Sequence, residues 1–87
     1  MALRPSQVET LRLVRRREEN RIRINDGMGP GLLAEQLGVT LKSARRRLER
    51  LRKSGHLYSL LGLADYGQYY RRAYRLTQLG REALEGQ

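Results

Sequence analysis

The sequence predicts a small, mainly α-helical domain of the α+β class: a three-helix core, one β-hairpin and a short last helix. Apolar residues recur at steps of three and four in three segments before position 55, as in amphipathic helices. Two β-prone runs, 57–61 and 69–76, follow. At 87 residues we expect a single domain, 1–87, which buries only about 60% of the surface that the unfolded chain exposes.

The first helix is predicted to begin at Ser6, which is followed three residues later by Glu9 in a capping-box pattern. Val8, Leu11 and Val14 then form a narrow apolar stripe. The arginines at 15–17 precede the glutamates at 18 and 19, so we expect partial neutralisation of charge within the helix.

A short strand is predicted next, because residues 21–24 alternate between arginine and isoleucine and turn-forming residues follow. The glycine-rich segment 27–31 is interpreted as a flexible loop, with Pro30 just before or at the first position of the second helix. That helix covers 32–37 and ends at Gly38, which accepts a left-handed conformation.

The third helix is predicted to follow a tight turn, with Thr40 as its N-cap, and to run from Leu41 to about Ser54 before Gly55 ends it. Its expected buried stripe is Leu41, Ala44, Leu48 and Leu51. At 100° per residue the opposite face is almost wholly cationic. This face consists of Lys42, Ser43, Arg46, Arg50 and Lys53, with Arg47 and Glu49 at its edges.

The runs 57–61 and 69–76 are expected to pair as a hairpin, with 62–68 as its tip. Thr77 is then placed to cap a last helix that runs through Leu79, Ala83 and Leu84.

Charge is the strongest compositional feature. The chain has 18 Lys and Arg against 9 Asp and Glu, a formal net charge of +9. Only Lys42 and Lys53 are lysines, so most of the charge is on guanidinium groups, which suit phosphate oxygens and the guanine edge. A genome rich in arginine codons would explain why arginine outnumbers lysine, but it would not explain the large positive net charge. The composition therefore indicates a polyanionic partner.

Several functional classes are excluded or disfavoured. The chain has no cysteine, and its single histidine, His56, has no catalytic or metal-binding partner at a recognisable spacing. The glycines at 27–31 lack the Gly-Lys-Ser/Thr ending of a nucleotide loop. No apolar run approaches the ~20 residues of a membrane span, and the first residues lack a signal-peptide core. We expect a soluble protein that is not an enzyme and has no cofactor.

The segment 33–48 resembles the helix-turn-helix of bacterial and archaeal winged-helix regulators. Ala34 matches the small residue at the helix crossing, Gly38 the turn glycine, and Ala44 and Leu48 the apolar positions of the recognition helix. Residues 51–57 resemble the exit into the wing, and 74–80 resemble the wing-to-helix junction of MarR-like and PadR-like proteins, within a pattern shared with Lrp-like proteins. Those families normally add long dimerisation helices or an effector domain, and we expect neither in these 87 residues.

The resemblance implies a winged helix-turn-helix fold that binds double-stranded DNA in a sequence-specific manner and regulates transcription. We expect a cytoplasmic, nucleoid-associated protein that belongs to a prokaryote or to its virus or plasmid. The recognition helix, 40–54, would enter the major groove, and the wing, 56–76, would meet the backbone or the minor groove. Base-edge candidates are Ser43, Arg46 and Arg50. The other expected DNA contacts are Thr40, Lys42, Arg45, Arg47, Lys53, Arg71 and Arg72.

Other interpretations stay open. The cationic helix face could be a solvated surface, and the wing arginines could protect an edge strand. A role in replication, partition or recombination needs the same interface, and RNA binding is a further possibility. A protein-interaction module could instead use an apolar patch of Leu60, Leu61, Leu63, Tyr66 and Tyr69. The tyrosines 66, 69 and 70 could also meet phosphate, stack on a base or cover the core. A homodimer through the first or last helix would supply two half-sites.

Overall fold

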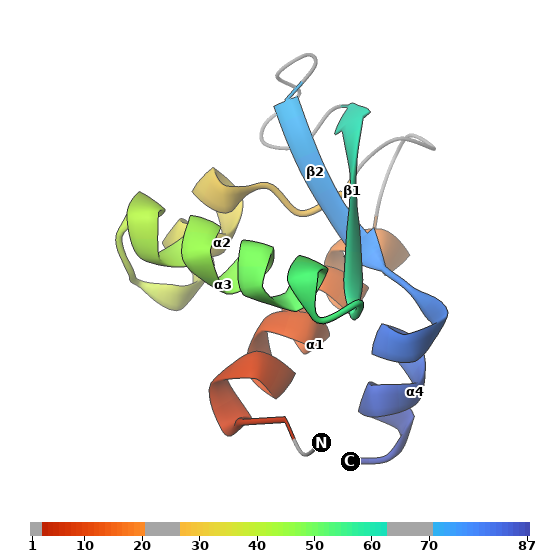
Figure 1. Cartoon of the computed structure of the whole chain (residues 1–87). Helices are drawn as coiled ribbons and strands as arrows, with labels where there is room; N and C mark the ends of the chain where they lie inside the picture. The colour runs from red at the N-terminus through yellow and green to blue at the C-terminus, as the bar shows by residue number, and fades with distance from the viewer. Residues whose placement is uncertain (1–2, 21–26, 63–70) are drawn as a thin grey trace.

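The computed structural model describes residues 3–20, 27–62 and 71–87. In chain order these residues form α1 (Pro5–Glu19), α2 (Pro30–Leu37), α3 (Leu41–Lys53), β1 (Leu57–Gly62), β2 (Arg71–Leu76) and α4 (Gln78–Glu85) (Figure 1). Three helices, a hairpin and a last helix confirm the predicted fold class. The predicted strand at 21–24, residues 69–70 and most of the predicted hairpin tip lie outside the described residues.

The start of α1 differs from the prediction. The helix begins at Pro5, and Arg4 is its N-cap. The backbone N–H of Arg4 donates to Oε1 of Gln7 at 2.8 Å. Ser6 and Glu9 are exposed residues within the helix, so the predicted capping box is wrong. Proline fits the first helical position because its φ is already helical and its missing N–H would have had no partner.

The turn between α2 and α3 is confirmed. Pro30 opens α2, and Gly38 ends it in the left-handed conformation, with φ of 68°. Thr40 precedes α3, and its Oγ1 accepts a hydrogen bond from the backbone N–H of Ser43 at 3.1 Å. These local interactions set the direction in which α3 leaves the turn.

The buried side of α3 is shorter than predicted. Ala44, Leu48 and Leu51 are buried, but Leu41 is 48% exposed. Leu41 is the first residue of the helix, and the contacts of α3 with the core begin one turn later, at Ala44. The helix ends at Lys53, with Ser54 as its C-cap, and Gly55 follows with a positive φ of 87°.

The two strands pair antiparallel, from Leu57 opposite Leu76 to Gly62 opposite Arg71. The other edge of β2 pairs with Met28, whose N–H donates to the Tyr74 carbonyl at 3.0 Å and whose carbonyl accepts from the Tyr74 N–H at 2.9 Å. The interpretation of 27–31 as a flexible loop is therefore wrong at Met28, which is fully buried. Gly27 permits this pairing, since a Cβ there would lie 3.0 Å from both the Ala73 Cβ and the Tyr74 carbonyl oxygen.

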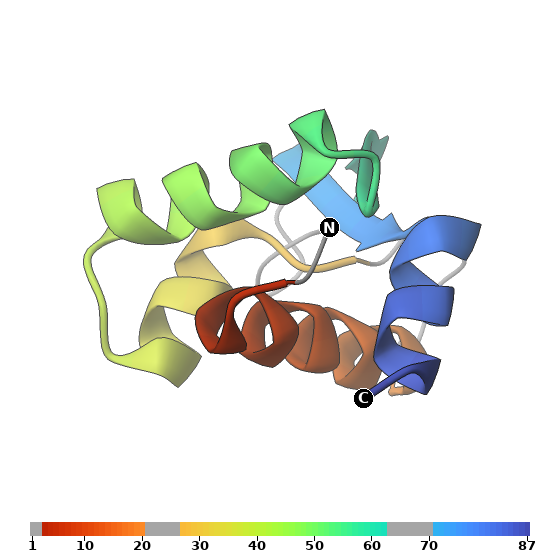
Figure 2. The ribbon, with the colours of Figure 1, turned by 60° about the horizontal axis from the view of Figure 1, so that its bottom comes forward.

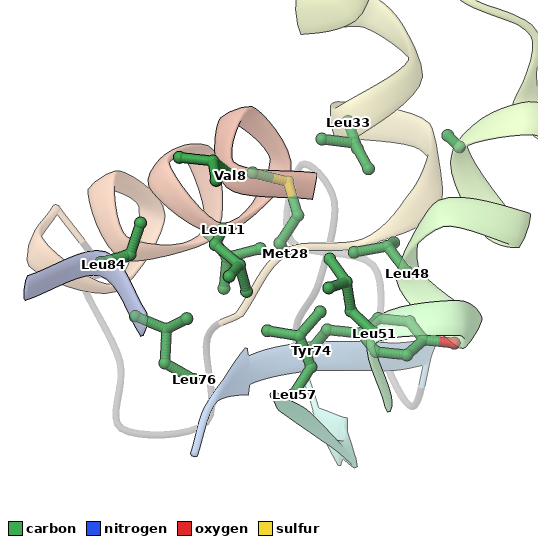
Figure 3. Close-up of a cluster of buried hydrophobic side chains, with 12 residues drawn as sticks. Val8, Leu11, Met28, Leu33, Leu48, Leu51, Leu57, Tyr74, Leu76 and Leu84 are labelled. Atoms are coloured by element: carbon green, nitrogen blue, oxygen red, sulfur yellow. The ribbon is translucent and has the colours of Figure 1, made fainter. Parts of the chain in front are cut away.

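The hydrophobic core lies between α1, α3 and the hairpin (Figure 3). The predicted stripe of α1, Val8, Leu11 and Val14, is buried in it. Figure 2 shows α1 and α3 as neighbouring layers, with α4 at one end of α1. The core thus fixes α3 by one side only and leaves its other side to the solvent.

The end of α1 is joined to the C-terminal part of the chain by a buried carboxylate. Glu18 accepts from the backbone N–H of Leu76 at 2.9 Å and forms ion pairs with Arg81 at 2.9 Å and Arg75 at 3.5 Å. The expected neutralisation within the helix is therefore wrong for Glu18. Its position continues the apolar stripe at a step of four from Val14, so its side chain points inward.

The capping of α4 by Thr77 is confirmed. Its Oγ1 accepts from the Gly80 N–H at 3.1 Å, and its hydroxyl donates to the Gly55 carbonyl at 2.6 Å. Leu84 is buried, whereas Leu79 is 47% exposed. The same threonine thus starts α4 and holds it against the exit from α3.

Candidate nucleic-acid interface

The predicted recognition residues lie together on the outer side of α3. Six of them are exposed: Thr40, Lys42, Arg45, Arg46, Arg50 and Lys53. Ser43 and Arg47 are half-buried. Because 100° separates successive residues, Arg45 and Arg47 lie at opposite edges of this face. We refer to the exposed side of α3 with these eight residues as the cationic face.

The charge of the cationic face is not compensated by acidic residues of the described chain. The α3 sequence has seven cations and one carboxylate, Glu49. Glu49 is engaged by Arg52, whose Nε lies 3.0 Å from Oε2 and whose Nη2 lies 2.9 Å from Oε1. The other six cations form no ion pair with any described residue. A strong positive potential at this face follows.

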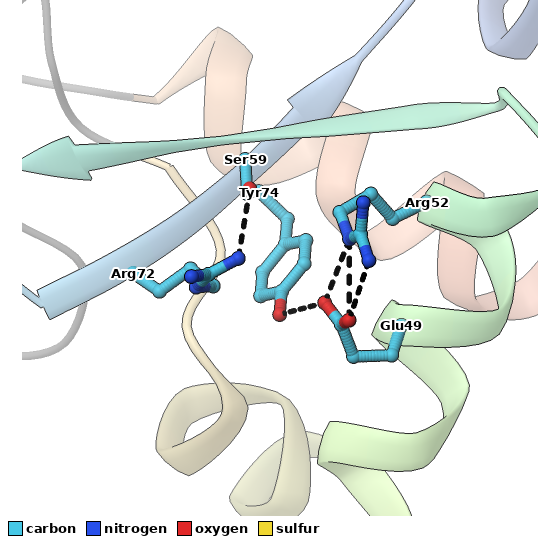
Figure 4. Close-up of polar contacts among 5 residues, drawn as sticks. All are labelled: Glu49, Arg52, Ser59, Arg72 and Tyr74. Carbon is cyan, nitrogen blue, oxygen red and sulfur yellow. Dashed lines mark hydrogen bonds and ion pairs between the residues drawn. The ribbon is translucent and has the colours of Figure 1, made fainter.

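Glu49 also joins α3 to the hairpin (Figure 4). The hydroxyl of Tyr74, on β2, donates to Glu49 Oε2 at 2.6 Å. The hydrogen bond from Arg52, and then that from Tyr74, lowers the pKa of Glu49 from 4.5 to about 2. Burial, and then the bond to the carboxylate, raises the pKa of Tyr74 to about 12. At neutral pH the carboxylate is ionised and the phenol is protonated, as this bond requires.

The two wing arginines stand at the far end of β2 from α4. Arg72 is exposed, and its Nη1 donates to Ser59 Oγ on β1 at 3.3 Å (Figure 4). Arg71 pairs with Gly62 in the backbone ladder, and its side chain is not among those described. Of the alternative apolar patch, Leu60 is half-buried, and the other members lie outside the described side chains.

The hairpin is held close to the C-terminal end of α3. The His56 N–H donates to the Leu51 carbonyl at 2.9 Å, so the chain turns directly from the helix into β1. The His56 Nδ1 lies 2.7 Å from Ser54 Oγ, so His56 takes part in the contacts of this turn. The hairpin therefore stands beside the cationic face (Figure 1).

Sequence reasoning placed Glu49 at an edge of the cationic face and missed its contact with the hairpin. The partner, Tyr74, is 25 residues away in the chain. The weak signal was a lone glutamate among the arginines of α3.

The described residues contain no group of three or more His, Cys, Asp or Glu side chains that could share a metal ion. None of the helices α1 to α4 has the length and apolar character needed to cross a bilayer.

These elements define a winged helix-turn-helix: α2, the turn at Gly38 and α3 are the helix-turn-helix, and β1 and β2 are the wing. The chain is similar to MepR of S. aureus in the crystal structure of the MepR–DNA complex, with a TM-score of 0.76 and 19% sequence identity. The alignment covers 97% of this chain and 53% of the MepR chain, so this chain spans about half the length of its structural neighbour. No family model and no curated protein sequence matches it. The predicted fold is thereby confirmed.

Proposed function

We propose that this chain binds double-stranded DNA in a sequence-specific manner and regulates transcription. The observation that carries the proposal is the cationic face, because six cations without an ion pair to any described residue stand on the exposed side of the second helix of a helix-turn-helix. In this motif that helix enters the major groove. The fold it shares with MepR, which was solved in complex with DNA, supports the same assignment.

The roles within the cationic face follow from side-chain chemistry. Arg46 and Arg50 carry planar forks that match the O6 and N7 acceptors of guanine, and Ser43 can donate to or accept from a base. Lys42, Arg47 and Lys53, with Arg45 and Thr40 at the margins, are proposed to contact phosphates.

The wing supplies the second contact in this proposal. Arg72 is exposed on β2, and Arg71 precedes it in the same strand. An arginine at this position of a hairpin can reach the minor groove, whose potential is most negative where the groove is narrow, or the adjoining phosphates.

One domain of this size contacts only a few base pairs, so we propose that two copies bind two half-sites about one helical turn apart. The exposed Leu79 makes α4 the candidate for the contact between copies.

The test is fluorescence anisotropy with a selected duplex, random duplex, single-stranded DNA and duplex RNA at low and physiological salt. The wild type is expected to prefer one duplex by about 10³ or more. Arg46→Ala/Arg50→Ala should abolish that preference. Arg12→Ala/Arg16→Ala is the matched control, since it removes the same charge from exposed positions of α1 and should keep the preference.

Equal binding to all four nucleic acids, or an unchanged preference in the α3 variant, would show that α3 does not read the sequence. A reporter gene placed next to the selected site then tests whether binding regulates transcription. Altered transcription supports regulation, whereas a bound site without effect would favour a role in replication or recombination.

A further inference from the structure

A pocket of about 220 Å³ opens between the start of α1 and the cationic face of α3. Four arginines line it: Arg4 from the N-cap of α1, and Arg46, Arg47 and Arg50 from α3. The hydroxyl residues Ser6 and Ser43 also contribute to its wall. We call this the arginine pocket.

The arginine pocket contains no carboxylate, unlike two other pockets of the described chain. On another side of α1, Glu9 accompanies Arg12 and Arg16. At the end of α1, Glu18 and Glu19 accompany three arginines. In the part of the chain that the structure describes, none of the four guanidinium groups of the arginine pocket takes part in an ion pair. Four like charges thus converge without compensation, an arrangement that favours a bound anion.

The chemistry of the wall selects the anion. Guanidinium forks match the oxygens of a phosphate in pairs, and such charge-assisted hydrogen bonds are stronger than neutral ones. The serine hydroxyls are further donors. A tetrahedral oxyanion with several acceptor oxygens can therefore use donors from both elements at once.

The arginine pocket and the wing lie on opposite sides of α3. At 100° per residue, Arg46, Arg50 and Arg47 turn progressively toward α1, whereas Glu49 and Arg52 turn toward the hairpin. The hairpin and the start of α1 therefore flank α3 on opposite sides (Figure 1). A helix in the major groove lies between two phosphate backbones, and the wing accounts for only one flank.

We infer that Arg4 and Arg47, on the α1 side of the arginine pocket, bind a phosphate of the DNA backbone at the groove edge remote from the wing, while Arg46 and Arg50 keep the base-edge role proposed above. Arg4 is then a contact outside the helix-turn-helix. This inference rests on the proposed function and adds to it a specific phosphate and a residue of α1.

The experiment measures binding of the selected duplex by Arg4→Gln, with Arg12→Gln as the control of equal charge change. Arg4→Gln should weaken binding about tenfold, the scale of one charge-assisted hydrogen bond, and by the same factor for good and poor duplex sequences. The slope of log K against log salt should fall in magnitude by about 0.9, as for one lost phosphate contact. Arg4→Lys should keep the slope, and thermal melts verify that each variant is folded.

A second arm leaves the protein unchanged and replaces single phosphates of the duplex by neutral methylphosphonates. One position should weaken the wild type and leave Arg4→Gln unaffected. If the wild type binds DNA with a preference that Arg46→Ala/Arg50→Ala abolishes, but Arg4→Gln equals Arg12→Gln and no such position exists, the pocket inference alone fails. If the wild type does not bind duplex DNA, both proposals fail.

Discussion

Tyr74 links three parts of the chain through different groups. Its backbone N–H and carbonyl pair with Met28, its ring is buried in the core, and its hydroxyl binds Glu49 of α3. The hydrogen bond to Glu49 couples the protonation of a carboxylate to the folded state. The free energy of unfolding measured at acid pH therefore depends on this coupling.

We expect Glu49→Gln to flatten the loss of stability in acid. The pKa of Glu49 is about 2 in the folded chain, below its ordinary value of 4.5, so below about pH 4.5 the unfolded chain takes up a proton that the folded chain resists. The contribution of Glu49 is present above pH 4.5 and is lost as the pH falls toward 2. Because the Glu49 side chain is 31% exposed, solvent screens the interaction, and its contribution to the free energy of unfolding is about 1 kcal/mol.

Urea unfolding at a series of pH values from about 5 down to 2 measures how the free energy of unfolding falls in the wild type and in Glu49→Gln. Tyr74→Phe is the comparison, since it keeps the pair with Arg52, the largest cause of the shift, and should lose a smaller part of the pH dependence. A Glu49→Gln variant with the acid profile of the wild type would contradict the coupling.

The individual site residues could be predicted to different degrees. Periodicity alone located the cationic face, because the orientation of a side chain on a helix depends on its position in that helix. The contacts of Glu18 with Leu76 and Arg81, and that of Glu49 with Tyr74, could not be predicted, since these partners are 58, 63 and 25 residues away in the chain. Arg4 was missed because the arginines beside it, Arg46, Arg47 and Arg50 of α3, lie more than 40 residues further along the chain.

At the scale of elements, α4 is positioned by one close approach. Gly80 lies in its first turn, and an added Cβ would collide with the backbone carbonyl oxygen of His56. That oxygen accepts from the Thr77 N–H at 3.1 Å, so it is held in place. The junction between α3 and β1 therefore leaves no room for a side chain at this position.

We expect Gly80→Ala to destabilise the fold by about 2 kcal/mol or more, because backbone would have to move to admit the methyl group. For a domain of this size this is a fall in Tm of about 8 °C or more. Gly86→Ala is the matched control at the other end of α4, where the nearest atom to a Cβ is at an ordinary 3.6 Å. Thermal melts that rank the two variants equally would refute the close approach.

The elements themselves were largely predictable, and the errors concern their ends. The turn at Gly38 and the caps Thr40 and Thr77 follow local chemistry that the sequence contains. At the start of α1 the capping-box pattern of Ser6 and Glu9 gave the wrong position, because Pro5 occupies the first helical position and Arg4 is the N-cap. Met28 was interpreted as loop because its glycine neighbours indicated flexibility, although its strand partner lies in the hairpin.

On the scale of the whole molecule, two acidic residues form ion pairs inside the fold and not with the cations of the cationic face. Glu18 and Glu49 neutralise arginines at contacts that hold the fold together. With a net charge of +9, and no acidic partner for the cationic face in the part of the chain that the structure describes, the chain repels itself and attracts polyanions. Added salt screens both the repulsion within the chain and its attraction for polyanions.

We therefore expect salt to change stability and DNA binding in opposite directions. Raising NaCl from about 50 to about 200 mM should raise the Tm of the protein, since screening weakens the self-repulsion. The same change should weaken duplex binding by about 10³ or more if six phosphates are contacted. Thermal melts and anisotropy titrations in matched buffers measure the two effects, and a Tm that falls with salt would show that ion pairs outweigh the repulsion.

The bond between Glu49 and Tyr74 has a consequence for the DNA as well as for the protein. It fixes the spacing between α3 and β2, so under the proposed function a duplex must present its groove and its backbone at that spacing. A duplex that does not match must bend or change its groove width, and the energy of this deformation depends on its base steps. Base pairs that no side chain touches would then influence affinity, and a variant that loosens the bond, Tyr74→Phe, would tolerate changes at those positions.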